Sequence, residues 1–179
     1  MNRFPLFLCA LVGVTFLTGC FDVTFEEPMP LRHRDLAHFP KTWQGQWMND
    51  EGERIQIGAY SFANEDSSEV YILGEAHVLR RYRDCLVLNQ LQDEGGWGVV
   101  VARRRGGTLQ LYTFDGSDEE KVACWREILI GTDMDNQAMV RSGVGPKTRY
   151  HLVPENNVAW RKLVQQGGLS PLMTYVKVE

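Results

Sequence analysis

The histidines, the residues best suited to metal binding and to acid–base catalysis near neutral pH, form no recognisable site in this chain. They are His33, His38, His77 and His151, and no two lie four residues apart, the helical spacing of a zinc site. Glu75 and His77 are two residues apart, and we expect a structural pair there rather than two ligands. Ser142 lacks the glycine-flanked turn of a serine nucleophile. We therefore expect no metal, no cofactor and no catalytic activity.

Two short runs of arginine are the strongest local concentrations of charge. Each run ends a predicted strand, and in an up-and-down meander both ends fall on the same side of the sheet. We therefore predict a basic rim that meets anionic headgroups, polysaccharide or an acidic partner, with solvated strand ends as the alternative. The residues are Arg80, Arg81, Arg83, Arg103, Arg104 and Arg105.

Residues 1–19 have the pattern of a secretion signal, with Arg3 ahead of an apolar run of about 15 residues. That run is shorter than the roughly 20 residues that a membrane-spanning helix needs. It ends in Leu17-Thr18-Gly19-Cys20, which resembles the lipobox of bacterial lipoproteins. The resemblance implies that Cys20 is acylated and holds the protein to a membrane that the chain does not span. Phe21 stands where an aspartate would retain such a lipoprotein at the inner membrane, so the resemblance favours the outer membrane, facing the periplasm.

The mature domain then contains two further cysteines, Cys85 and Cys124, in an oxidising compartment. An even pair there favours a disulfide, which would join a predicted helix to a predicted strand. Two separate buried thiols are the alternative.

From Trp43 onward the chain shows short runs of period two, which predict antiparallel strands separated by turns rich in Gly, Asn and Asp. Ser117 and Glu120 fit a capping box at the start of a helix, and Trp160 belongs to the apolar stripe of a second helix. The predicted helices cover 118–129 and 157–166. The predicted strands lie near 43–48, 53–60, 69–80, 84–92, 97–104, 108–114, 137–142, 149–153 and 172–178.

These elements predict a mainly β domain over 41–179, attached to Cys20 by a stiff, exposed tether over 20–40. Closing into a small antiparallel barrel would remove the open edges of the sheet, and a β-sandwich is the alternative. Gly45-Gln46-Trp47 resembles the Gly-x-Trp of the first lipocalin strand, and a helix before the last strand is similar to the end of a lipocalin. The resemblance implies a barrel closed at one end by Trp47.

The balance of 19 basic against 23 acidic residues gives a net charge of −4, which excludes a strong cationic field for nucleic acid. Small residues at 74, 76, 98 and 102 favour interior space. We therefore expect a lipid-anchored barrel that binds a small apolar or amphipathic ligand. The alternative is a protein-interaction module of the cell envelope, such as an inhibitor or an assembly accessory.

Overall fold

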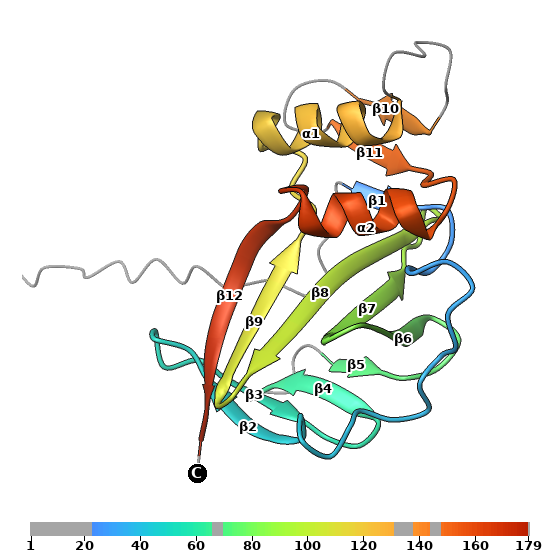
Figure 1. Ribbon diagram of the computed structural model, residues 1–179. Coiled ribbons are helices and arrows are strands. Elements are labelled where there is room, and N and C mark those ends of the chain that lie inside the picture. The colour runs from blue at the N-terminus through green and yellow to red at the C-terminus, as the bar shows by residue number, and fades with distance from the viewer. Residues whose placement is uncertain (1–22, 66–69, 131–137, 144–147, 179) are drawn as a thin grey trace, which may run out of the picture.

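The computed structural model describes residues 23–65, 70–130, 138–143 and 148–178, and in this part the chain is mainly β (Figure 1). Most of the predicted strands and both predicted helices are confirmed. The strands are β1 (Val23–Phe25), β2 (Gly45–Met48), β3 (Arg54–Ile57), β4 (Ser61–Asn64), β5 (Val70–Ile72), β6 (His77–Tyr82), β7 (Cys85–Leu91), β8 (Trp97–Arg105), β9 (Thr108–Thr113), β10 (Met139–Ser142), β11 (Arg149–Leu152) and β12 (Ser170–Lys177). The helices are α1 (Glu119–Leu129) and α2 (Asn157–Gln165).

The twelve strands of the described residues belong to one sheet, in which β8 is the central strand. One edge of β8 pairs with β7, which pairs with β6. The other edge pairs with β9 and, through Trp97, with β1. From β9 the sheet continues through β12, β2, β3, β4 and β5, while β11 and β10 extend it beyond β1. The sheet therefore branches at β8 into a curved main part and a short arm of β1, β11 and β10.

The sheet does not close, so the small barrel is not confirmed. The predicted strand 69–80 is instead two strands, β5 and β6, separated by a turn in which the Gly74 and His77 amides bond each other's carbonyls. These two strands do not pair with each other. The segment 35–39 follows β6, where Asp35 forms a bridge with Arg80, and continues to the turn between β3 and β4. Its Leu36 amide donates to the Leu79 carbonyl (2.7 Å), and its Phe39 amide donates to the Ala59 carbonyl (2.8 Å). This irregular segment covers an opening that a closed barrel would fill with strand pairing.

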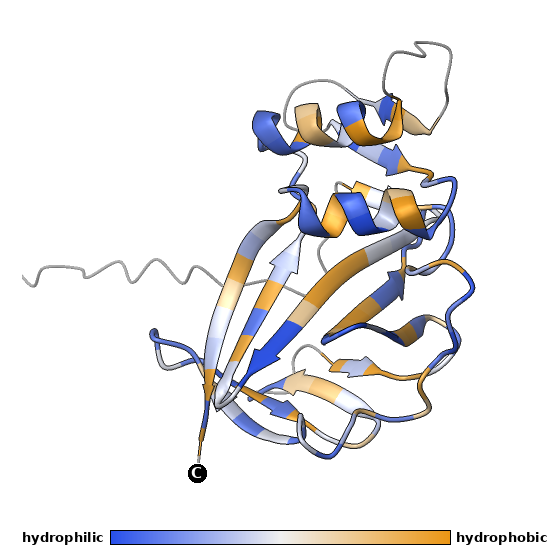
Figure 2. Ribbon diagram, in the orientation of Figure 1, coloured by the Kyte–Doolittle hydropathy of each residue, from blue (hydrophilic) through white to orange (hydrophobic). Residues whose placement is uncertain are grey.

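Apolar side chains pack on both faces of the sheet, because β8 alternates between two cores. Figure 2 shows the hydrophobic colour along much of β8. Val99 and Val101 face the first core, which lies between the sheet and the two helices. Val100 and Ala102 face the second core, which fills the concave side of the curved sheet. The two cores explain why β8 reads as a nearly continuous apolar run.

Both helices begin and end close to their predicted bounds. In α2 the predicted stripe of Trp160, Leu163 and Val164 is buried against the sheet. The capping box predicted for α1 is wrong, because Asp118 is the N-cap and accepts from the amides of Glu120 and Lys121. Ser117 is one residue too early and instead donates to Asp115 (2.6 Å).

The prediction of an exposed tether is wrong from Val23 onward. Val23 and Met29 are 1% exposed and Phe25 is completely buried. Phe39, at the far end of the segment, is also buried. After β1, side chains of β6 and β7 bond the backbone of residues 28–30, so this stretch is held in place without a strand or helix period.

Candidate functional site

The predicted disulfide between Cys85 and Cys124 is not formed, and both thiols are free. The Cys85 sulfur accepts a hydrogen bond from Nε of Arg103 (3.3 Å), whereas the Cys124 thiol donates to the Gln166 carbonyl (3.4 Å). The rotation of α1 explains the separation, because the helix turns Trp125 into the core and leaves Cys124 facing the end of α2. Packing, rather than a covalent bond, therefore joins α1 to the sheet.

We expect unreduced, denatured protein to be alkylated at both cysteines, and native protein to react at Cys124 before the buried Cys85. Burial raises the pKa of both thiols, so the reactive thiolate is scarcer than in an ordinary cysteine at the same pH. The rate at Cys124 is therefore expected to keep rising as the pH increases beyond the usual thiol range. Intact mass after iodoacetamide treatment measures the labelling. If both cysteines resist labelling in denaturant without a reductant, the disulfide is formed after all.

The predicted basic rim is only partly assembled. Register pairs Arg103 with Cys85, just after the β6–β7 turn, so both arginine runs do meet at one end of the sheet. Four of the six guanidinium groups nevertheless make contacts within the domain: Arg80 binds Asp35 and the backbone of the segment 28–30, while Arg83, Arg103 and Arg104 lie over Tyr82, Tyr112 and Trp47. Arg81, Arg83 and Arg105 are exposed.

Trp47 is completely buried at this same end of the curved sheet, as predicted. Its indole N–H donates to the Trp43 carbonyl (2.9 Å). Arg104 and Lys177 lie 5.9 Å and 5.6 Å from the ring centroid. The indole is therefore held by a hydrogen bond and by two flanking cations.

The concave side of the sheet, where the ligand was expected, is occupied by large side chains. Trp47 and Tyr71 are at most 2% exposed there. The small residues at 74 and 76 lie in the turn between β5 and β6, and Ala102 packs inside the second core. Small residues in the sequence therefore did not indicate interior space. The side chains that fill this face include Phe39, Trp43, Trp47, Phe62 and Tyr71.

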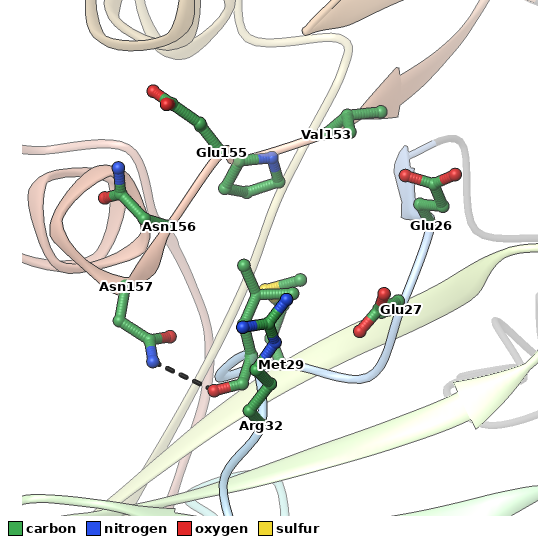
Figure 3. A pocket seen from close by; sticks show the side chains of 10 residues that line it. Glu26, Glu27, Met29, Arg32, Val153, Glu155, Asn156 and Asn157 are labelled. Atoms are coloured by element: carbon green, nitrogen blue, oxygen red, sulfur yellow. Dashed lines mark hydrogen bonds between the residues drawn. The ribbon is translucent and has the colours of Figure 1, made fainter.

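A groove of about 330 Å³ opens on the other side of the molecule, between the segment that follows β1 and the start of α2 (Figure 3). We call it the acidic groove. Its apolar part comes from Met29, Leu31, Val153 and Pro154. The polar side chains around it are Glu26, Glu27, Arg32, Glu155, Asn156 and Asn157.

The acidic groove carries three carboxylates and one guanidinium, which sum to a charge of −2. Glu26, Glu27 and Glu155 are all exposed, and in the described part of the chain none of them forms an ion pair. The side-chain amide of Asn157 donates to the Leu31 carbonyl (2.9 Å), while its buried oxygen has no hydrogen-bond partner. Apolar contact and negative charge therefore come together at one place.

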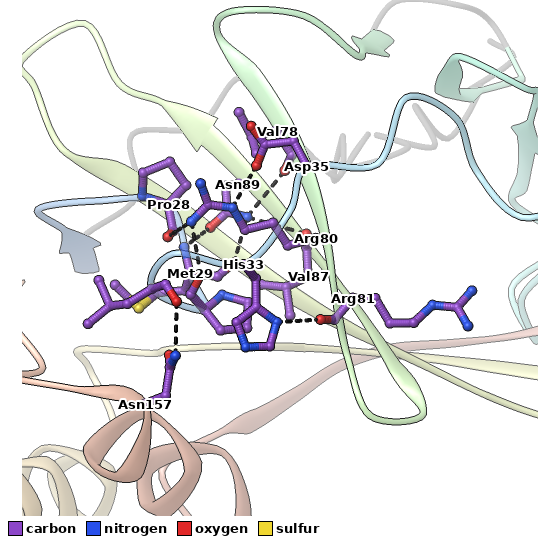
Figure 4. A network of polar contacts seen from close by, with 12 residues as sticks. Pro28, Met29, His33, Asp35, Val78, Arg80, Arg81, Val87, Asn89 and Asn157 are labelled. Atoms are coloured by element: carbon purple, nitrogen blue, oxygen red, sulfur yellow. Dashed lines mark hydrogen bonds and ion pairs between the residues drawn. The ribbon is translucent and has the colours of Figure 1, made fainter.

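Side chains of β6 and β7 hold the floor of this groove in place (Figure 4). The side chain of Asn89, itself fully buried, accepts from the Met29 amide (2.6 Å) and donates to the Met29 carbonyl (2.9 Å). Arg80 donates to the carbonyls of Pro28 and Pro30, on either side of Met29. On the opposite wall, Asn156 caps α2 and so fixes where Asn157 stands. The groove is thus preorganised. In the sequence its residues have the pattern of a tether and of a loop, which gave no signal of a site.

The described residues contain no group of three His, Cys, Asp or Glu side chains positioned to hold a metal ion. His33 binds the Arg81 carbonyl, and His77 binds the Ile72 carbonyl rather than Glu75. The signal peptide over 1–19 and Cys20 lie outside the described residues. None of the helices in the described part is both long and apolar enough to cross a membrane.

No protein-family model, curated protein or solved structure matches the chain.

Proposed function

We propose that the protein is a lipid-anchored, non-catalytic binding module of the cell envelope, attached through Cys20, whose ligand site is the acidic groove. The ligand is a primary ammonium or guanidinium group on a short apolar stem, such as the lysine or arginine side chain of an envelope protein. The open groove outside the curved sheet, combined with the filled concave face, is the observation that carries this proposal.

The groove matches such a ligand in size and in chemistry. A volume near 330 Å³ is at the lower end for small-molecule sites, which suits one side chain better than an extended lipid. Met29 and Pro154, both buried, contribute apolar surface for the stem. Glu26, Glu27 and Glu155 attract the charged head.

We expect octylamine to bind the protein expressed from Phe21 onward, and octanoate and methylammonium to bind much more weakly. Replacing Glu26 and Glu155 together with glutamine should weaken octylamine binding roughly tenfold, because two partly screened charge interactions of the order of 1 kcal/mol are removed. Isothermal titration calorimetry measures both effects.

The matched control for these substitutions is glutamine at Glu119 and Glu120, which makes the same charge change in the first turn of α1. Its octylamine affinity should equal that of the wild type. Equal binding of octanoate and octylamine, or unchanged octylamine affinity in the groove variant, would refute the proposed site.

The anchor is tested separately with Cys20→Ser. We expect this substitution to remove the acyl mass and to move the domain into the soluble envelope fraction, because more than one buried acyl chain is needed for stable anchoring. Cell fractionation and intact mass measure the result. A variant that still fractionates with membranes, together with wild-type protein that carries no acyl mass, would show that Cys20 is not the anchor.

A further inference from the structure

The first fixed residue of the domain lies very close in sequence to the proposed anchor. Val23 is 1% exposed and begins a strand, only three residues after Cys20. Three extended residues span roughly 10 Å. If Cys20 is acylated, the start of β1 is therefore held within about that distance of the lipid headgroups.

The start of β1 is also locked into the fold, so the domain cannot lengthen this connection by releasing it. Val23 and Phe25 pair with Tyr150 and Leu152 of β11, and Phe25 pairs with Trp97 of β8. Gly96 permits this close approach, since a Cβ at that position would lie 3.0 Å from the Thr24 side chain. Beyond β1, the contacts of Asn89 and Arg80 hold the chain again at residues 28–30.

From this geometry we infer that the arm of β1, β11 and β10 lies against the membrane, with its outer face turned towards the headgroups. The inner face of the arm is unavailable, because Val23, Phe25, Tyr150 and Leu152 are buried in the first core. Strand register places five residues together on the outer face: Thr24, Val140, Ser142, Arg149 and His151. This inference rests on the acylation of Cys20 that the proposed function includes.

The chemistry of the outer face suits a headgroup layer. Val140 is apolar and 45% exposed. Burial of such a side chain at a bilayer surface is favourable. Arg149 is half-exposed and neutralises Glu94, the acid that it contacts.

This orientation directs the opposite end of the molecule away from the membrane (Figure 1). β8 starts at Trp97 beside β1 and ends at Arg105, eight residues or roughly 26 Å further on. Arg105 and Lys177 therefore lie at the end remote from the anchor, since Lys177 bonds the Gly107 carbonyl in the next turn. The exposed arginines of the predicted rim then face the aqueous compartment, not the headgroups of the anchoring membrane.

The inference is tested with the full acylated protein, purified from membranes and reconstituted into vesicles of phosphatidylethanolamine and phosphatidylglycerol. A fluorophore is attached at Val140→Cys, or at Val176→Cys as the matched control, both in a Cys124→Ser background. Val176 is equally suitable for labelling because it is 58% exposed, but it lies at the remote end of β12. Quenching by lipids spin-labelled in the headgroup is measured, and intact mass reports acylation of each sample.

We expect several-fold stronger quenching at position 140 than at position 176, and loss of this difference when ten Gly and Ser residues are inserted between positions 22 and 23. Equal quenching at both positions, or stronger quenching at 176, in protein that carries the acyl mass would overturn the orientation and leave the anchor intact. Protein without acyl mass would overturn the anchor, and this inference with it. A difference that survives the insertion would refute the short connection as its cause.

Discussion

Replacing Trp47 with alanine is expected to lower the free energy of unfolding by about 3 to 5 kcal/mol, the usual range for a large buried aromatic residue. Trp47 is completely buried among side chains that come from several strands of the curved sheet. Truncation removes its apolar contacts and its hydrogen bond to the Trp43 carbonyl. It also leaves Arg104 and Lys177 without the ring that lies between them. Urea unfolding monitored by circular dichroism measures the change.

Tyr60→Ala is the control for this substitution, because it also removes an aromatic ring, but from the exposed turn between β3 and β4. Tyr60 is 63% exposed, so its loss should change stability by no more than about 0.5 kcal/mol. A similarly small change for Trp47→Ala would contradict the burial of Trp47 and the filled concave face.

The parts of the fold that could be predicted are those in which the sequence repeats with a regular period. The strands from β7 to β9 bury alternate or continuous apolar residues, and α2 buries a stripe, so each gives a signal over six or more residues. β1 has three residues and β4 has four, which is too short for a period to stand out. Closure was overestimated for a different reason, because strand pairing at the ends of a sheet depends on the path of the intervening turns.

The candidate site could not be predicted, because its parts are joined by contacts between residues far apart in sequence. Asn157 bonds Leu31, and Asn89 bonds Met29, across 126 and 60 positions. Neither pair has a local pattern. The cysteine pairing failed similarly, since the spacing of Cys124 fixes its place on α1 but the rotation of the helix is decided by the burial of Trp125. The burial of Trp47, in contrast, had a local signal in the resemblance carried by Gly45-Gln46-Trp47.

The two hydrogen bonds between the Asn89 side chain and the Met29 backbone, which we call the Asn89 latch, predict the second large effect on stability. Replacing Asn89 with leucine keeps most of the volume but removes the group that satisfies both the amide and the carbonyl of Met29. Met29 is 1% exposed, so water cannot replace these bonds. With about 1 to 3 kcal/mol for each buried backbone group left unpaired, the free energy of unfolding should fall by about 3 to 5 kcal/mol.

Gln92→Leu is the control for this latch, because it makes the same change from amide to alkyl at a partly exposed position, where the side-chain amide donates to the Gln90 carbonyl. We expect little change in its stability, and none in octylamine binding. Asn89→Leu, in contrast, should speed hydrogen exchange at the Met29 amide and at the Leu36 amide, which bonds Leu79. It should also weaken octylamine binding, because Asn89 holds the floor of the acidic groove. If Asn89→Leu is as stable as Gln92→Leu and the exchange at these two amides is unchanged, neither the segment 28–39 nor the groove depends on the latch.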